Sequence, residues 1–122
     1  MNKTKRQIHR FLFAGISAVA TDLISYYILL EYVDPAAAKT LSFLLGTIVA
    51  YIINKYWTFE KHVHSYIEIV KFTVLYASTL VVNVTANEII LNQSNMVLMA
   101  FLVATGISTI LNFIGQKWWV FK

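Results

Sequence analysis

The chain contains no cysteine and few charged residues. It therefore has no disulfide, no thiol nucleophile and no thiolate metal ligand. Only 13% of its 122 residues are charged, whereas soluble domains carry about a quarter. A P-loop, a nucleophile elbow and paired histidines at metal-ligand spacing are also missing. We therefore expect no enzyme activity, no catalytic residue, no metal site and no cofactor.

Long apolar segments take the place of these features, because 58% of the residues are hydrophobic. There are four such segments of about 18 to 23 residues, and each is long enough to cross a hydrocarbon core of roughly 30 Å. Period-two alternation is absent, so strands are not expected. The prediction is an all-α, polytopic membrane protein that forms one domain over residues 1–122. Its four transmembrane helices are expected near residues 11–33, 36–54, 70–91 and 95–116.

The positive charges lie almost entirely on one side of these predicted helices. Of the ten Lys and Arg residues, only Lys39 falls on the other side. Cytoplasmic loops carry such an excess, so both termini are predicted to be cytoplasmic. Because the charges sit at segment ends and form no stripe on one face, we expect no nucleic-acid partner. The nine residues on the cytoplasmic side are Lys3, Lys5, Arg6, Arg10, Lys55, Lys61, Lys71, Lys117 and Lys122.

The sequence also repeats itself at an offset of 62 residues. Residues Thr47–Phe59 then fall on Thr109–Phe121, and six of the thirteen positions are identical. At an offset of 61, Arg10 meets Lys71. Each repeat holds two apolar segments, so we expect two repeated helical hairpins that enter the membrane from the same side.

Each repeat ends with a lysine beside a cluster of aromatic rings, Lys55-Tyr56-Trp57-Thr58-Phe59 in the first and Lys117-Trp118-Trp119-Val120-Phe121 in the second. Tryptophan and tyrosine prefer the headgroup layer of a bilayer, and lysine can extend to it. We therefore expect these rings at the membrane interface: Tyr56, Trp57, Phe59, Trp118, Trp119 and Phe121.

Several polar residues interrupt the apolar segments. Asp22 lies near the middle of the first, where an acidic side chain costs roughly 2.5–3.5 kcal/mol. It is interpreted either as a ligand or proton site or as a hydrogen-bonding partner for another helix. The same two interpretations, a hydrated path or helix–helix hydrogen bonding, apply to the amides further along the chain. These are Asn54 on the second segment, Asn83 and Asn87 on the third, and Asn112 and Gln116 on the fourth.

Four cations stand at the cytoplasmic ends of the segments: Arg10, Lys55, Lys71 and Lys117. Membrane topology alone explains most of them, but a basic collar can also capture an anionic lipid headgroup. Asn54 and Gln116 each place an amide directly before a lysine, and this pairing suits a phosphate or a sugar hydroxyl.

The chain resembles the GtrA-like family over nearly its whole length. The resemblance lies in Arg10-Phe11-Leu12-Phe13-Ala14-Gly15, in Asp22, in Asn54-Lys55-Tyr56-Trp57-Thr58-Phe59, and in Asn112-Phe113 with the closing Lys117-Trp118-Trp119-Val120-Phe121. Gln116 departs from the pattern, because an Asn is typical before the cation. The resemblance implies a small four-helix protein of the bacterial or archaeal cytoplasmic membrane. Such proteins are thought to flip polyprenyl-phosphate-linked monosaccharides, which glycosyltransferases then add to surface polysaccharides such as teichoic acid.

The resemblance and the polar residues together suggest a substrate path. The phosphate would dock on Arg10, Lys55 and Lys117, and the sugar would pass polar side chains in the interior. Four helices enclose little volume, so a homo-oligomer is expected. The expected partners are a polyprenyl-phosphate-linked sugar, membrane lipid and membrane glycosyltransferases. The full set of expected substrate-binding residues is Arg10, Asp22, Asn54, Lys55, Asn83, Asn87, Asn112, Gln116 and Lys117.

Two alternatives stay open at this point. The protein could be a small proton-coupled multidrug exporter with Asp22 as its proton site, although its aromatic rings cluster at the interface and form no cage for a cation. It could also be a scaffold that stabilises a membrane glycosyltransferase without transporting anything. In a scaffold the polar residues would serve only to hold helices together.

Overall fold

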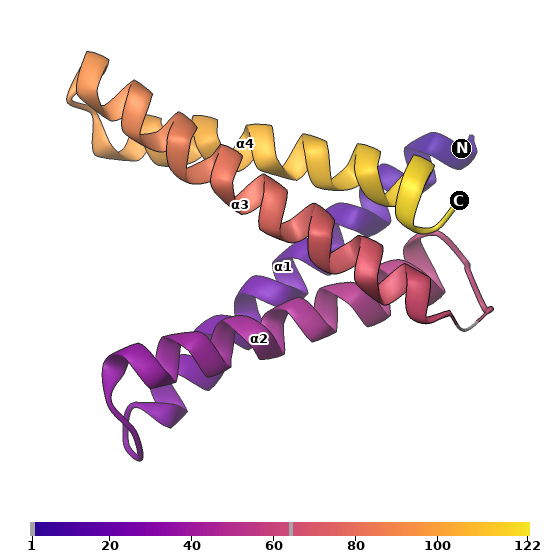
Figure 1. Cartoon of the computed structure of the whole chain (residues 1–122), viewed down its shortest axis with the longest axis horizontal. Helices are drawn as coiled ribbons and strands as arrows, with labels where there is room; N and C mark the ends of the chain where they lie inside the picture. Colours follow the sequence, from indigo (N-terminus) through magenta and orange to yellow (C-terminus); the bar gives the residue numbers. More distant parts are fainter. Residues whose placement is uncertain (1, 64) are drawn as a thin grey trace. The chain divides into compact units, whose positions relative to one another are not determined.

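The computed structural model describes residues 2–63 and 65–122, without the side chains of residues 35, 36 and 39. This part of the chain forms four α-helices and no strand (Figure 1). The helices are α1 (Lys3–Leu29), α2 (Pro35–Ile53), α3 (Tyr66–Ser94) and α4 (Val97–Gly115). A five-residue π-helix continues α2 and another continues α4: η1 (Asn54–Thr58) and η2 (Gln116–Val120).

Short polar side chains define where the helices begin. The Asn2 carboxamide accepts a hydrogen bond from the Lys5 amide at 2.8 Å, and the Ser65 hydroxyl accepts one from the Ile67 amide at 3.2 Å. Such caps satisfy amides that have no partner within the helix. As a result, α1 and α3 begin before the expected spans, and the basic N-terminal segment is helical.

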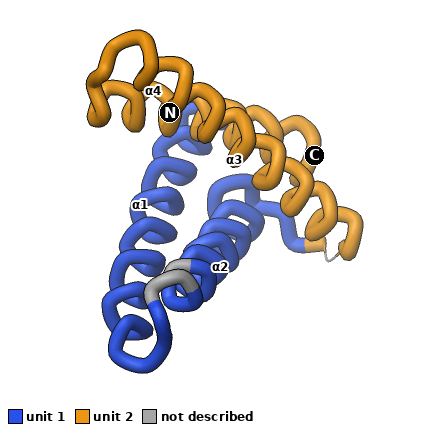
Figure 2. The backbone as a smooth tube through the Cα atoms, turned by 60° about the vertical axis from the view of Figure 1, so that its left-hand side comes forward, with its two compact units in different colours: residues 1–62 blue, residues 63–122 orange. Residues whose placement is uncertain are grey.

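The chain divides into two compact units, residues 1–62 and residues 63–122 (Figure 2). The first hairpin is α1–α2 with η1, and the second hairpin is α3–α4 with η2. The turn of the second hairpin lies at Asn95, whose left-handed φ of 55° is tolerated by asparagine.

Small residues spaced by four allow the two helices of each hairpin to approach closely. On α2 the buried stripe contains Ala38, Ser42, Gly46 and Ala50, and a Cβ added at Gly46 would lie only 2.8 Å from the carbonyl oxygen of Ala18 on α1. Packing of this kind, rather than a core of large side chains, is typical of helices in lipid. The corresponding buried residues of α4 are Ala100, Ala104 and Ser108.

In the part of the chain that the structure describes, three helical segments are long and apolar enough to cross a membrane: Lys3–Leu29, Tyr66–Ser94 and Val97–Val120. Large hydrophobic side chains are exposed along all of them, for example Ile16, Val81 and Leu102. So much exposed apolar surface needs lipid around it. Within the described residues α2 is not one of these segments, so the fourth span and the cytoplasmic position of the termini stay predictions.

Candidate functional site

The two π-helical turns give each hairpin the same ending. The Phe59 amide donates to the carbonyl oxygen of Asn54 at 2.9 Å, and the Phe121 amide donates to that of Gln116 at 2.8 Å. These bonds span five residues instead of four, and such turns are rare and often lie at functional sites. Since η1 and η2 are 62 residues apart, the backbone repeats at the same offset as the sequence.

Arg10 ties α1 to the π-helical turn of the first hairpin. Its Nη1 donates to the Trp57 carbonyl oxygen and to Glu60 Oε1, both at 2.8 Å. The guanidinium carbon lies 5.0 Å from the centre of the Trp57 ring, within cation–π range. Phe13 meets the same ring edge-on at 5.4 Å. Arg10 therefore holds η1 against α1. Its acidic partner Glu60 was not predicted from the sequence. The only sequence signal for Glu60 is its position directly after the aromatic segment.

Glu60→Gln is expected to lower the free energy of unfolding by about 0.5–1 kcal/mol. The value is small because Glu60 and Arg10 both keep contact with solvent, with side-chain exposures of 49% and 26%. Thermal unfolding in detergent measures the effect, and high salt should shrink it because exposed charges are screened. Glu31→Gln, at another exposed acid, is the matched control. Equal shifts for the two variants would contradict a specific Arg10–Glu60 pair.

Two of the expected substrate-binding residues of the first hairpin are buried. Lys55 is 2% exposed, and its Nζ lies 5.5 Å from the Tyr56 ring centre and 5.9 Å from that of Tyr51. Asn54 is also buried, and its Oδ1 accepts a hydrogen bond from the Thr58 hydroxyl at 2.9 Å. The first π-helical turn therefore satisfies this amide oxygen internally.

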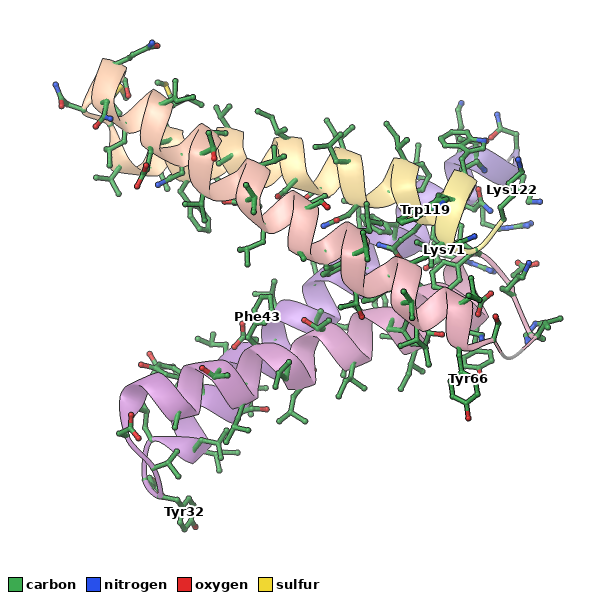
Figure 3. All side chains as sticks on the ribbon, viewed as in Figure 1. Tyr32, Phe43, Tyr66, Lys71, Trp119 and Lys122 are labelled. Carbon is green, nitrogen blue, oxygen red and sulfur yellow. The ribbon has the colours of Figure 1, made fainter. Side chains whose placement is uncertain are left out.

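A cation also lies over a tryptophan in the second hairpin. Lys71 Nζ is 5.8 Å from the centre of the Trp119 ring, and Lys117 Nζ is 5.3 Å from that of Trp118. Figure 3 shows Lys71 and Trp119 close together. Lys71 and Trp119 thus repeat the Arg10–Trp57 pair. The sequence offset of 61 aligns Arg10 with Lys71, and the offset of 62 aligns Trp57 with Trp119.

Gln116 is completely buried in the second π-helical turn. Within residues 2–63 and 65–122, neither its Nε2 nor its Oε1 has a hydrogen-bond partner. The Tyr76 hydroxyl is near this amide, but the pair does not have hydrogen-bond geometry. Buried amides are nearly always paired, so Gln116 is an exception that needs a physical reason.

Nearer the middle of the helices, polar side chains bridge the two helices of each hairpin. In the first hairpin the Ser42 hydroxyl donates to Asp22 Oδ1 at 2.6 Å. In the second, the Thr79 hydroxyl donates to Asn112 Oδ1 at 2.7 Å, and Asn83 Nδ2 donates to the Ser108 hydroxyl at 2.9 Å. Both the packing interpretation and the substrate-path interpretation are compatible with such bonds.

Ser42 and Thr79 were not identified from the sequence. Ser42 could have been found from its place in the small-residue stripe of α2, whereas Thr79 carries no comparable signal. Asn87 is half-buried and takes part in none of the interhelical bonds seen in the described residues. A metal site needs a group of at least three His, Asp or Glu side chains, and the described residues contain no such group.

The fold and these sites define a small helical membrane protein made of two repeated hairpins, each of which ends in a cation–tryptophan π-helical turn. The chain belongs to the GtrA/DPMS transmembrane-domain family, whose model matches residues 10–121. It is 26% identical over 119 residues to the uncharacterized membrane protein YwcD of Bacillus subtilis (strain 168), covering 92% of this chain and 94% of that protein. No solved structure matches the chain. Family membership associates it with polysaccharide glycosylation at a membrane.

Proposed function

We propose that this protein flips a polyprenyl-phosphate-linked monosaccharide across the cytoplasmic membrane of a bacterium or archaeon, for glycosylation of a cell-surface polysaccharide. The repeated cation–tryptophan turn is the observation that carries the proposal. It combines positive charge with interfacial aromatic rings, which suits an anionic lipid headgroup. Family membership supports the same class of substrate.

The interior polar groups supply the second part of the proposal. No covalent bond changes during flipping, so the protein only has to shield the sugar and the phosphate from hydrocarbon. Asp22, Asn83 and Asn112 can exchange their present interhelical hydrogen bonds for bonds to sugar hydroxyls. The polyprenyl tail would stay in lipid, against the exposed apolar faces of the helices.

The remaining features of the proposal follow from topology and size. With α2 as a fourth span, both termini face the cytoplasm, where the lipid-linked sugar is made. A chain of 122 residues encloses little volume, so the transporting unit is a homo-oligomer. The sugar delivered to the outer leaflet is consumed by a membrane glycosyltransferase, and the protein itself performs no chemistry.

Reconstitution tests the proposal directly. Purified protein is placed in vesicles with a fluorescent polyprenyl-phosphate sugar, and a membrane-impermeant quencher reports how much label stays in the inner leaflet. In protein-free vesicles the inner-leaflet label should survive, whereas vesicles with the protein should lose nearly all of it within minutes. Protected label equal to that of protein-free vesicles would contradict transport.

A scaffold for a glycosyltransferase is the second candidate. It is favoured by the interhelical bonds, because they already pair Asp22, Asn83 and Asn112 within their own hairpins. A scaffold predicts inert vesicles, together with loss of the glycosyltransferase from membranes of a deletion strain. A translocase predicts active vesicles and unchanged amounts of the enzyme.

A further inference from the structure

The two π-helical turns match in backbone and sequence position but differ in how far they satisfy their own polar groups. We propose that the second turn, η2, binds the sugar–phosphate headgroup through Gln116 and the neighbouring lysines, while the first turn, η1, has a structural role. This inference rests on the proposed function for the chemistry of the ligand. It assigns the headgroup to one of two repeated turns.

The first difference concerns the buried amide. In η1, the Thr58 hydroxyl donates to Asn54 Oδ1 at 2.9 Å. The offset of 62 places Val120 at the position of Thr58, and valine has no hydroxyl to donate. Gln116 accordingly keeps an unpaired oxygen and an unpaired nitrogen at zero exposure. An amide offers both a donor and an acceptor, which is the combination that a sugar hydroxyl or a phosphate oxygen needs.

The second difference concerns charge. In the first hairpin, Arg10 is neutralised by Glu60, with 2.8 Å between Nη1 and Oε1. The offset of 62 places Lys122 at the position of Glu60, so the repeat exchanges an acid for a base. Figure 3 shows Lys71, Trp119 and Lys122 at the same end of the second hairpin. Glu68 lies one turn before Lys71, is buried, and has contacts of its own. The second π-helical turn is therefore followed by a base, where the first is followed by an acid.

The unpaired amide also explains how a buried group can contact a ligand. Leaving both polar atoms of Gln116 without partners destabilises the conformation described here relative to one in which they are paired. A conformation that opens η2 to a headgroup would supply those partners, so the ligand would shift the population toward it. Flipping requires at least two conformations, and on this proposal the one with Gln116 buried is the closed state.

The test compares Gln116→Met with Thr58→Val in the full-length protein. Methionine has nearly the shape of glutamine without its polar atoms, so the variant should fold with an unchanged or raised Tm. Binding of a polyprenyl-phosphate-linked glucose in nanodiscs should weaken by at least about tenfold. Thr58→Val removes the donor to Asn54, and should lower the Tm while leaving that affinity within about twofold.

Val120→Thr provides a second, nearly isosteric variant. It gives the second turn the hydroxyl that Thr58 supplies in the first, so it should pair Gln116 internally and weaken binding at least about threefold. If Gln116→Met does not fold, the affinity of Val120→Thr for the lipid is the test. An affinity equal to that of the wild type, in Gln116→Met if it folds and otherwise in Val120→Thr, would overturn the inference. Displacement of the lipid by an excess of soluble glucose 1-phosphate would support the inference, because the headgroup is the part that η2 is proposed to bind.

The same experiments separate this inference from the proposed function. If the wild type flips the lipid and Gln116→Met flips it equally well, the proposed function stands and the assignment of the headgroup to η2 is wrong. If the wild type binds the lipid without flipping it, and Gln116→Met does not bind it, the assignment to η2 stands and the proposed function is wrong.

Discussion

Leucine in place of Gly46 is expected to destabilise the first hairpin by about 3 kcal/mol. A Cβ at this position would lie 2.8 Å from the Ala18 carbonyl oxygen and 3.3 Å from the Asp22 Cβ. The first of these atoms belongs to the backbone of α1, so no change of side-chain rotamer can relieve the clash. The helices must separate instead, and with them the Ser42 hydroxyl and the Asp22 carboxyl.

Two other glycines provide graded controls, measured by thermal unfolding in the same detergent. Gly106 has nothing within 4 Å of an added Cβ, so Gly106→Leu should leave the Tm almost unchanged. An added Cβ at Gly115 would lie 2.5 Å from Leu75 Cδ1, the end of a flexible side chain, so Gly115→Ala should have an intermediate effect. A Tm for Gly46→Leu equal to that of Gly106→Leu would show that α1 and α2 do not approach this closely.

The helices and their pairing into hairpins could be predicted because they depend on local patterns. Apolar segments long enough to cross a bilayer are visible in the sequence, and so is the repeat of aromatic and cationic residues. The early starts of α1 and α3 could also have been read from Asn2 and Ser65, since both residue types favour N-caps.

The π-helical turns and the hydrogen-bond partners could not be predicted in this way. A π-helical turn has no sequence signature of its own. The Arg10 contact with the Trp57 carbonyl oxygen joins residues 47 positions apart. Likewise, the choice of Ser42 for Asp22 and of Thr79 for Asn112 depends on the register between two helices, which packing determines. The sequence could name polar residues inside the helices, but not which of them would meet.

The repeat is symmetric in its backbone and asymmetric in its polar groups. Both hairpins have the small-residue stripe and the cation over a tryptophan. The two copies differ at Val120, which stands where the first copy has Thr58, so Gln116 lacks the donor that Asn54 has. Packing does not explain an unpaired buried amide, whereas a ligand that binds the second copy would.

Asp22→Asn is expected to lower the rate of flipping by at least about tenfold while leaving the Tm nearly unchanged. The Ser42 hydroxyl donates to Asp22 Oδ1 at 2.6 Å, and asparagine keeps an oxygen that can accept this bond. The substitution therefore preserves the link between α1 and α2 but removes the ionisable group. Asp22→Ala removes both, and should also lower the free energy of unfolding by about 1 kcal/mol.

The two variants distinguish a substrate site from a purely structural hydrogen bond. If Asp22 only joins the helices, Asp22→Asn should behave like the wild type in the vesicle assay, and only Asp22→Ala should be impaired. Glu88→Gln, at an exposed acid on α3, is the matched control and should flip the lipid normally. Surface glycosylation in a strain carrying Asp22→Asn extends the test to the cell, where wild-type levels would count against Asp22 as part of the path. A loss of glycosylation with normal amounts of protein in the membrane would place the acidic group on the route of the sugar, because folding and insertion would then be intact.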